Sequence, residues 1–592
     1  MANPLVADRD IDFLLYEVVD VERLCALDAF EDHSRETFDM FLQSVRRVAR
    51  QVLYPAYRPM DDEAPELVDG SVRTHPLMQE IYPQLVGLGI LTASRPPEVG
   101  GAQLPLTVAS LASGYLMAGN LSAYAYAGLT QGAARLIESF GSEALQARFM
   151  EPMYEGRWTG TMALTEPQAG SSLSDVATRA TQIADGVYSL TGTKIFLSGG
   201  DQDFTENIVH LTLARIDGAP AGVKGISLFA VPKLRPEGDD LVPNDVSTAG
   251  VFHKVGWRGI PSIALNLGDN SDCKGWLVGE PHQGLKYMFQ MMNEARLMVG
   301  MNGAASASAA YHEALDYART RPQGRTLGAK DPTQPQVPII EHAEVRRLLL
   351  RQKAIVEGAF GLLATVSMYA DLEDHGADEA TRREAGLMVE LLTPVAKSFP
   401  AERGFEANTL AIQIHGGYGY TTEYLPERWW RDQKLNSIHE GTTQIQGLDL
   451  LGRKVVTPGA LEALTGAVDA TIARARQQGL DEWSDALQSG LQTVGEVTMT
   501  LGGWGLSGDV QRMMRHSHDF LDLFGTFVVA WQWLEQAAAA TEARREGSAD
   551  FYAGKLASAR YWMSTELPRI EHLARLCTSA EDSYATMQDA WF

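Results

Sequence analysis

The sequence predicts a mainly α-helical protein with a central β domain. Apolar residues recur at helical spacing up to about residue 160, alternate with polar ones over residues 161–280, and return to helical spacing after residue 281. A chain of 592 residues is also too long for a single hydrophobic core. We therefore expect several domains in the order α, β, α, followed by further helices.

The first predicted domain is helical and covers residues 35–160, after a helical N-terminal extension of residues 1–34. Its clearest helix lies in HSRETFDMFLQSVRRVARQVL, residues 33–53, where apolar residues recur at helical spacing. Ser34, with Thr37 close behind it, is typical of a helix N-cap. The cap predicts that this helix begins next to Ser34.

The predicted β domain covers residues 161–280. Asp185-Gly186 lies between two strand-like runs, which is a strong signal for a tight hairpin turn, and Asp217-Gly218 repeats the pattern. We expect several antiparallel strands, closed as a barrel or a sandwich.

Helices are predicted for the rest of the chain. Residues 281–455 contain four long amphipathic segments with short connections, which indicates an antiparallel four-helix bundle, interrupted by a proline-broken loop at 329–340. Residues 460–592 are helical again and are expected to form an appended domain. Within it, the run Gly502-Gly503-Trp504-Gly505 is expected to break a helix.

Composition excludes several classes of function. A net charge of -25 argues against nucleic acid or an anionic membrane surface as partner. The three cysteines are far apart and form no CxxC pair, so neither a disulfide framework nor a metal site is expected. The N-terminus lacks the pattern of a signal peptide, and no apolar run is long enough to span a membrane. A cytoplasmic protein without membrane insertion is expected.

Three stretches at the domain junctions are richer in glycine and polar residues than packing requires. MALTEPQAGSS, residues 162–172, offers backbone N–H groups and hydroxyls that suit a planar heteroaromatic ring and a phosphate. In TKIFLSGG, residues 193–200, Phe196 and Ser198 share one face of a strand, so a ring could stack on one while the other bonds its edge. Each stretch by itself also fits a polar turn or core packing.

The third stretch identifies the family. QIHGGYGYT (413–421), RDQK (431–434) and IHEGTTQIQ (438–446) strongly resemble the C-terminal signature of acyl-CoA dehydrogenases. LTEPQAGS and GTKIFLSGG resemble the flavin loop and the flavin strand of the same family. The resemblance spans roughly residues 35–455, and the longer chain is most similar to extended bacterial fatty acyl-CoA dehydrogenases, whose relatives include methylthiopropanoyl-CoA dehydrogenase.

The resemblance implies FAD-dependent dehydrogenation of an acyl-CoA thioester to a trans-2-enoyl-CoA. Glu440 matches the base that takes the α-proton while a hydride leaves Cβ for N5 of FAD. The α-proton is weakly acidic, so the base has to be desolvated and the thioester carbonyl polarised. Medium- or long-chain acyl groups of β-oxidation are expected. The alternatives are methylthiopropanoyl or a short branched acyl group, or an acyl-CoA oxidase.

Further contacts follow from the same resemblance. FAD is expected to touch Met162, Leu164, Thr165, Gly170, Ser171, Phe196, Ser198 and Thr442. The FAD of a neighbouring subunit is expected to touch Arg321, Gln413, Gly416 and Gly417. The acyl-CoA is expected to touch Ser171, Asn293, Arg296 and Gly441.

The resemblance also implies partners. Electrons are expected to pass to an electron-transfer flavoprotein. The appended domain is expected to cover the bundle face that pairs two dimers in shorter relatives, which leaves a homodimer. A DNA-associated flavoprotein of the same fold is disfavoured, because residues 456–592 hold more acidic than basic side chains. The family usually has Tyr before the base, whereas this chain has His439, whose role the sequence leaves open.

Overall fold

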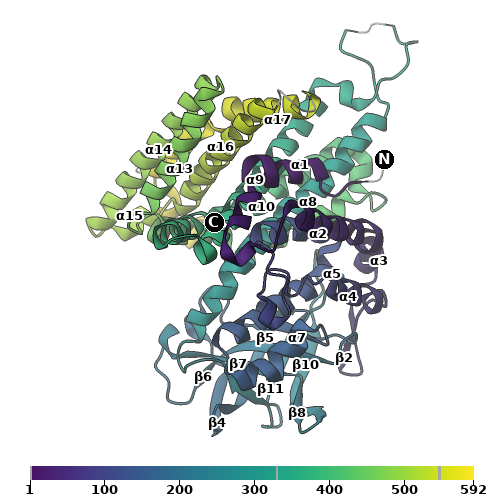
Figure 1. Ribbon diagram of the computed structural model, residues 1–592, viewed down its shortest axis with the longest axis vertical. Helices are drawn as coiled ribbons and strands as arrows, with labels where there is room; N and C mark the ends of the chain where they lie inside the picture. Colours follow the sequence, from purple (N-terminus) through teal and green to yellow (C-terminus); the bar gives the residue numbers. More distant parts are fainter. Residues whose placement is uncertain (1–2, 329–330, 544–548, 580) are drawn as a thin grey trace.

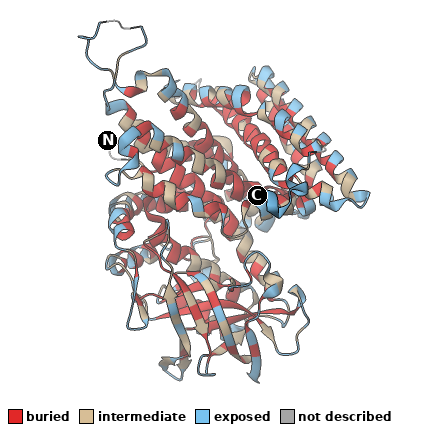
Figure 2. Ribbon diagram, turned by 180° about the vertical axis from the view of Figure 1, so that it is seen from behind, coloured by how far each residue is buried: buried red, intermediate tan, exposed pale blue. Residues whose placement is uncertain are grey.

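The computed structural model describes residues 3–328, 331–543, 549–579 and 581–592. Long bundle helices lie between a β domain and the appended C-terminal helices (Figure 1). Buried residues run continuously through the bundle helices and into the appended domain (Figure 2). The bundle is therefore the core on which the other parts are assembled.

The N-terminal region is helical. Its helices are α1 (Asp8–Phe13), α2 (Arg35–Val48), α3 (Tyr54–Asp62), α4 (Met78–Gly87), α5 (Leu106–Phe140), α6 (Glu143–Leu145) and α7 (Glu151–Tyr154). Ser34 caps α2 in a reciprocal box with Thr37, as its sequence predicts. A short hairpin of β1 (Glu66–Val68) and β2 (Ser71–Arg73) was not predicted, although its Asp69-Gly70 turn is a hairpin signal.

The β domain is a closed barrel. Its strands are β3 (Trp158–Ala163), β4 (Arg179–Ala184), β5 (Val187–Ser198), β6 (Asn207–Ile216), β7 (Ile226–Pro232), β10 (Val246–Val251), β11 (Ser262–Leu267) and β12 (Lys274–Leu277). A ring closes because β4 pairs with both β5 and β6, while β12 and β7 complete the circuit. The small ribbon β8 (Leu234–Glu237) and β9 (Asp240–Pro243) stands apart.

One of the two predicted hairpin turns is correct. Asp185-Gly186 joins β4 to β5, with Ala184 opposite Val187. Asp217-Gly218 forms a tight turn, closed by the N–H of Ala219 bonding to the carbonyl of Ile216 at 3.0 Å, but this turn does not join β6 directly to β7. The connection from β6 to β7 is a longer loop.

The bundle consists of α8 (Gly284–Thr320), α9 (Ala343–His375), α10 (Glu379–His415), α11 (Pro426–Gln433) and α12 (Thr443–Asp449). The first three are long and continuous. The fourth segment is split into the short helices α11 and α12, and the residues between them carry the predicted base. This break is a functional loop inside an otherwise regular bundle.

The appended domain consists of α13 (Ala460–Gln477), α14 (Asp481–Leu506), α15 (Val510–Met514), α16 (Ser517–Ala543), α17 (Ala549–Tyr561), α18 (Arg569–Thr578) and α19 (Ser583–Thr586). The predicted break at Gly502–Gly505 is wrong, because α14 continues to Leu506 and ends before Gly508, whose φ is 91°. The N–H groups of Ser507 and Gly508 bond back to this glycine run. Glycine lowers helix propensity but does not forbid a helix.

Helix α16 packs directly on the bundle. A Cβ at Gly358 of α9 would lie 2.7 Å from Val529 of α16, so glycine permits the close approach. Trp533 Nε1 donates to the carbonyl of Ala354 at 3.1 Å. The appended domain thus covers a face of α9 that would otherwise be exposed apolar surface.

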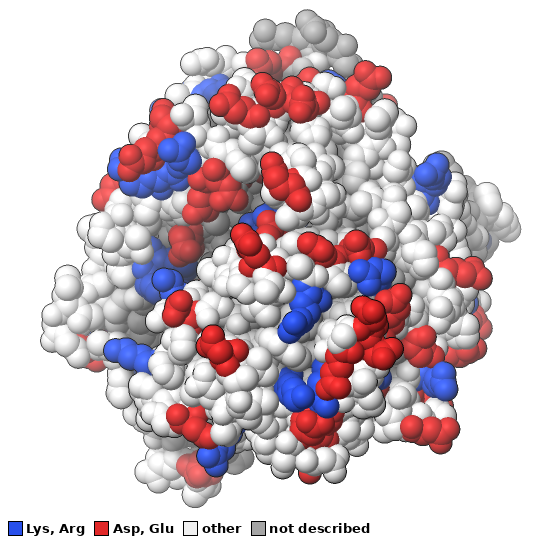
Figure 3. Space-filling view, turned by 60° about the horizontal axis from the view of Figure 1, so that its bottom comes forward, with Lys and Arg blue, Asp and Glu red and all other residues white. Residues whose placement is uncertain are grey.

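One described helix, α9, is long and apolar enough to cross a membrane, but 78% of its apolar window is buried inside the protein. Such burial is typical of a core helix. On the face shown in Figure 3, acidic and basic side chains are interspersed.

Candidate active site

The predicted base lies on a strained loop between α11 and α12. Glu440 has φ 53° and Gly441 has φ 87°, so two consecutive residues adopt the left-handed conformation. A Cβ at Gly441 would lie 2.5 Å from the side-chain nitrogen of Gln446, so glycine is required there. The same nitrogen donates to the carbonyls of Glu440 at 3.2 Å and Gly441 at 3.3 Å. These contacts hold a conformation that non-glycine residues rarely adopt.

A close crossing of α8 and α10 brings two positive charges towards this loop. A Cβ at Gly300 would lie 2.0 Å from the carbonyl oxygen of Ala396, so the two backbones touch. Arg296 lies one turn before this contact on α8, and Lys397 lies next to it on α10. The two cations reach the loop because the helices cross where glycine removes the side chain.

Burial and the neighbouring positive charges shift the pKa of Glu440 in opposite directions. Burial raises the pKa of Glu440, whereas the positive charges of Arg296 and Lys397 lower it, with burial prevailing. Arg296 is itself buried and pairs with Asp449 at 3.3 Å. A carboxylate with a raised pKa inside a cation-lined pocket is suited to accept a proton from a weak carbon acid.

His439, next to the base, is neutral. Its ring meets the ring of Trp257 edge-on, with centroids 5.1 Å apart. Burial and the nearby Lys397 lower the pKa of His439 to about 3. A lowered pKa favours the uncharged imidazole at neutral pH.

The flavin-loop segment is tied to the neighbouring strand by a buried ion pair. Lys194 of β5 lies 2.7 Å from Glu166 of the loop, and both side chains are almost fully buried. Glu166 also accepts hydrogen bonds from Thr178 and from the N–H of Ala177. Burial raises the pKa of Glu166, but Lys194 and these hydrogen bonds lower it to about 2. The pair fixes the loop against the barrel.

A β-bulge presents Phe196 to the surface. The pairing of β5 with β11 shifts between Lys194 and Leu197, and Phe196 has φ 59°. Its ring is 59% exposed and touches Phe252, with centroids 4.6 Å apart. An exposed ring on a bulge, beside the open polar loop, fits the planar ring of a flavin.

A cavity of about 110 Å³ lies between α5 and α8. Met162, at the start of the flavin loop, lines it together with Met291 and Met298. Arg135 and Glu294, paired at 2.9 Å, also line it. Arg135 lines a second cavity of about 210 Å³ as well, so this ion pair stands between the two spaces.

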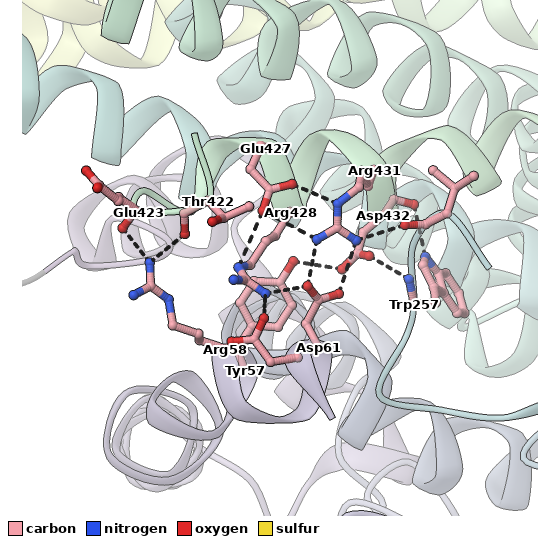
Figure 4. A network of polar contacts seen from close by, with 12 residues as sticks. Tyr57, Arg58, Asp61, Trp257, Thr422, Glu423, Glu427, Arg428, Arg431 and Asp432 are labelled. Carbon is pink, nitrogen blue, oxygen red and sulfur yellow. Dashed lines mark hydrogen bonds and ion pairs between the residues drawn. The ribbon is translucent and has the colours of Figure 1, made fainter. Parts of the chain in front are cut away.

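Asp432, eight residues before the predicted base, belongs to a polar network that joins three parts of the chain (Figure 4). The Asp432 carboxylate accepts from Tyr57 Oη at 2.8 Å and from the N–H of Trp257 at 2.6 Å. Asp61 pairs with Arg431 at 2.6 Å. The N-terminal helices, the β domain and the bundle are therefore fixed to one another beside the catalytic loop.

The structure brings most predicted flavin contacts together. Local hydrogen bonding joins loop and strand, since the N–H of Ile195 donates to Thr165 at 2.9 Å. The residues on this loop and strand are Met162, Leu164, Thr165, Gly170, Ser171, Phe196 and Ser198. Thr442 instead caps α12, where its hydroxyl accepts from the N–H of Ile445 at 3.3 Å.

A second group lies at the C-terminal ends of α8 and α10. Gln413 is near the end of α10, Gly416 ends it with φ 60°, and Gly417 follows. The Arg321 guanidinium lies 5.6 Å from the ring of Tyr418. Among the described residues, no hydrogen bond or ion pair links this group to the flavin loop. Its contact with a neighbouring subunit's FAD stays a prediction.

Two predicted substrate contacts need comment. Arg296 is buried and paired with Asp449 at 3.3 Å, and its contact with the acyl-CoA stays a prediction. Asn293 lies on α8, and its side chain is outside the described part.

Sequence reasoning missed three side chains that organise the site. Glu166 and Lys194 lie inside the flavin-loop and flavin-strand motifs, but their pairing depends on how loop and strand fold together. Lys397 is a lone charge in the apolar run LLTPVAKSFP. A charged residue in such a run was the available signal, since buried charges are kept where they have partners.

Comparisons with known proteins agree with this arrangement. Family models match the N-terminal, middle and C-terminal domains of acyl-CoA dehydrogenases over residues 35–157, 161–269 and 282–456, and an acetyl-CoA dehydrogenase C-terminal-like model over 464–588. The chain is 38% identical to 3-methylmercaptopropionyl-CoA dehydrogenase of Ruegeria pomeroyi, over 93% of this chain and 94% of that protein.

Two further matches extend over almost the whole chain. Identity to butyryl-CoA dehydrogenase of Syntrophomonas wolfei is 32%, over 100% of this chain and 99% of that protein. The fold matches an acyl-CoA dehydrogenase from Bacillus anthracis complexed with FAD, with a TM-score of 0.74, 20% identity, and coverage of 99% and 94%. The chain belongs to the acyl-CoA dehydrogenase family and is an FAD-dependent acyl-CoA dehydrogenase.

Proposed function

We propose that this enzyme dehydrogenates short acyl-CoA thioesters, with methylthiopropanoyl-CoA among them. The cavity between α5 and α8 carries the proposal. A cavity of about 150 Å³ accommodates a benzene ring, so about 110 Å³ leaves room for roughly four non-hydrogen atoms. The Arg135–Glu294 pair limits the space, because an apolar chain passing it would desolvate both charges.

The cavity wall also suits a thioether. Met162, Met291 and Met298 supply polarisable sulfur and flexible side chains around the space. The similarity to 3-methylmercaptopropionyl-CoA dehydrogenase supports the same choice. The medium- or long-chain alternative requires the ion pair to move aside.

The chemistry follows from the residues around the base. Glu440 removes the proton from Cα. Burial raises the pKa of Glu440 and so brings it closer to the pKa of the α C–H of the thioester. The neutral His439 and Trp257 pack beside the base and help exclude water from it. Bound FAD would supply the acceptor for the hydride that leaves Cβ, so that loss of the α-proton and this hydride would give the trans-2-enoyl-CoA.

The test is a turnover panel with an artificial electron acceptor, using straight acyl-CoAs from C4 to C18 and methylthiopropanoyl-CoA. We expect the highest kcat/KM at C4 to C6 and with methylthiopropanoyl-CoA, and a fall of at least about tenfold by C12, because longer chains meet the ion pair. Equal or higher kcat/KM at C12 to C16 would establish the long-chain alternative.

The same acyl-CoA panel is measured with the double variant Arg135→Ala/Glu294→Ala for comparison. Removing both partners avoids an unpaired buried charge and opens the partition to the second cavity. We expect the preferred chain to lengthen while butyryl-CoA is still oxidised. An unchanged preference would mean that the ion pair does not set the limit.

An electron-transfer flavoprotein is the proposed electron acceptor. The alternative is an oxidase, in which oxygen reoxidises the reduced flavin directly. Stopped-flow reoxidation in air separates the two, since a dehydrogenase reoxidises slowly in air and rapidly with the flavoprotein. Rapid reoxidation by oxygen alone would assign the chain to the oxidases.

A further inference from the structure

Two side chains of α10 brace the catalytic loop from behind. Lys397 Nζ donates a hydrogen bond to the carbonyl of Gly441 at 2.9 Å. One helical turn further on, the Glu402 carboxylate accepts from the hydroxyl of Thr443. Both contacts fall within three residues of Glu440, on the C-terminal side where the left-handed loop turns into α12.

The lysine is unusual for its position. Its side chain is fully buried in a bundle helix, between Pro394 and Pro400. Removing an ammonium group from water costs several kcal/mol unless the group gains compensating contacts. The Gly441 carbonyl and the negative charges of Glu402 and Glu440 compensate in part, but burial prevails and lowers the pKa of Lys397 to about 8.

We propose that Lys397 is a positioning residue for the base, holding the Gly441 carbonyl and placing a positive charge near the Glu440 carboxylate before substrate enters. This inference rests on the proposed role of Glu440 as the base. The hydrogen bond fixes the direction of the carboxylate through the adjoining peptide. The charge favours the ionised form of the carboxylate, which is the form that accepts a proton.

The charge of Lys397 shifts the pKa of Glu440 in a defined direction. Burial alone favours the protonated carboxyl of Glu440, and Lys397 and Arg296 oppose it. Without the Lys397 charge, the pKa of Glu440 rises further, so the base becomes active only at higher pH. Other charged or titratable groups around this region include His439, Arg296, Asp449, Glu402, Arg453 and Glu390. Glu402 also lines a cavity with Arg403 and Glu406 of α10 and with His518 and Asp522 of α16.

The experiment compares Lys397→Met, Lys397→Gln and Lys397→Arg in the full-length, FAD-loaded enzyme. The readout is the rate of flavin bleaching by butyryl-CoA in single turnovers across pH 5 to 10. In Lys397→Met we expect the acid limb of the profile to move up by about one pH unit or more, as for a carboxylate that loses a neighbouring cation. The plateau at high pH should fall by roughly tenfold to a hundredfold, because a misplaced base loses alignment.

The other two variants separate charge from geometry. Lys397→Gln keeps an N–H donor without charge, so its acid limb should move as in Lys397→Met. Lys397→Arg keeps the charge, so its acid limb should stay near that of the wild type even if the plateau falls. The Gln variant also keeps the test available if Lys397→Met does not fold.

Lys555→Met is the control, since Lys555 is an equally buried lysine that pairs with Asp10 and Glu357 and makes no described hydrogen bond or ion pair with the catalytic loop. It should lower the melting temperature without moving the pH profile. Folded Lys397→Met and Lys397→Gln variants with the wild-type profile, or with a uniform loss of rate and no shift, would overturn the proposal. Failure of wild-type enzyme to bleach with any acyl-CoA would instead contradict the proposed function.

Discussion

At the scale of single residues, the active site contains an unfavourable backbone conformation and unfavourably placed charges, which contacts with neighbouring residues stabilise. Glu440 adopts a left-handed backbone, which costs a non-glycine residue about 1–2 kcal/mol. The Lys397 ammonium is fully buried and Glu440 is half-buried, which is unfavourable for each charge in isolation. The two groups share one site, so each offsets part of the other's cost of burial.

The first prediction at this scale concerns Glu440→Gln. The amide keeps the shape of the side chain but cannot accept the α-proton, so flavin bleaching should slow by at least about 10²-fold. FAD content, measured from the visible absorbance of the purified protein, should stay at the wild-type level. A variant that keeps more than a tenth of the wild-type rate would rule out Glu440 as the base.

At the scale of elements, an ion pair and hydrogen bonds between the flavin loop and strand β5 hold the residues that are predicted to contact the flavin. The Glu166–Lys194 pair anchors the loop after β3 to β5, and the bulge in β5 turns Phe196 outwards. The loop is therefore attached to the barrel independently of any ligand. A rigid element of this kind can bind a cofactor without first having to be ordered.

Glu166→Gln tests this tie. It leaves the Lys194 ammonium buried without its counter-charge, which costs about 3–5 kcal/mol. We expect weaker FAD retention in gel filtration and a lower melting temperature at pH 7. The double variant Glu166→Gln/Lys194→Met should recover part of that loss, because no buried charge is left. A double variant worse than the single one would contradict the ion-pair explanation.

The same pair predicts a pH dependence. The pKa of Glu166 is lowered to about 2 in the folded state from an ordinary value near 4.5. Its contribution to stability is therefore fully present above about pH 4.5 and is lost as the pH falls towards 2. In denaturant unfolding, the wild type should therefore lose more free energy of unfolding between pH 4.5 and 2 than Glu166→Gln does.

At the scale of the whole molecule, the appended domain completes the bundle. Trp533 and Gln536 of α16 donate to backbone carbonyls of α9, and the tip of the Lys555 side chain reaches both Glu357 of the bundle and Asp10 of the N-terminal extension. Three distant parts of the chain thus share one buried interface. We propose that this domain takes the place of a second dimer and leaves a homodimer.

Truncation after residue 456 tests this arrangement. The apolar faces of α9 and α10 that α16 covers would become exposed, so we expect aggregates or a higher oligomer in light scattering. The intact chain should give a homodimer of twice the 64.7 kDa chain mass. Deleting only residues 583–592, which are mostly exposed, is the control and should leave the dimer unchanged. A tetramer for the intact chain, or an unchanged dimer after truncation, would contradict the proposal.

Local signals in the sequence determined the fold class, the order of the parts and the catalytic motif. The Ser34 cap, the Asp185-Gly186 turn and the IHEGTTQIQ run are short, and each depends on neighbours within a few residues. Periodicity of apolar residues is equally local, because helices and strands bury one face with a fixed repeat. The amino-acid sequence alone therefore suffices to predict these features.

Only the tertiary structure decided the remainder. The continuation of α14 through Gly502 and the long loop after Asp217 both depart from local preference. Lys397, which precedes Gly441 by 44 residues, reaches its carbonyl because α10 packs against the segments on either side of the catalytic loop. Pairings between distant segments depend on close packing in three dimensions, which has no local signature in the chain.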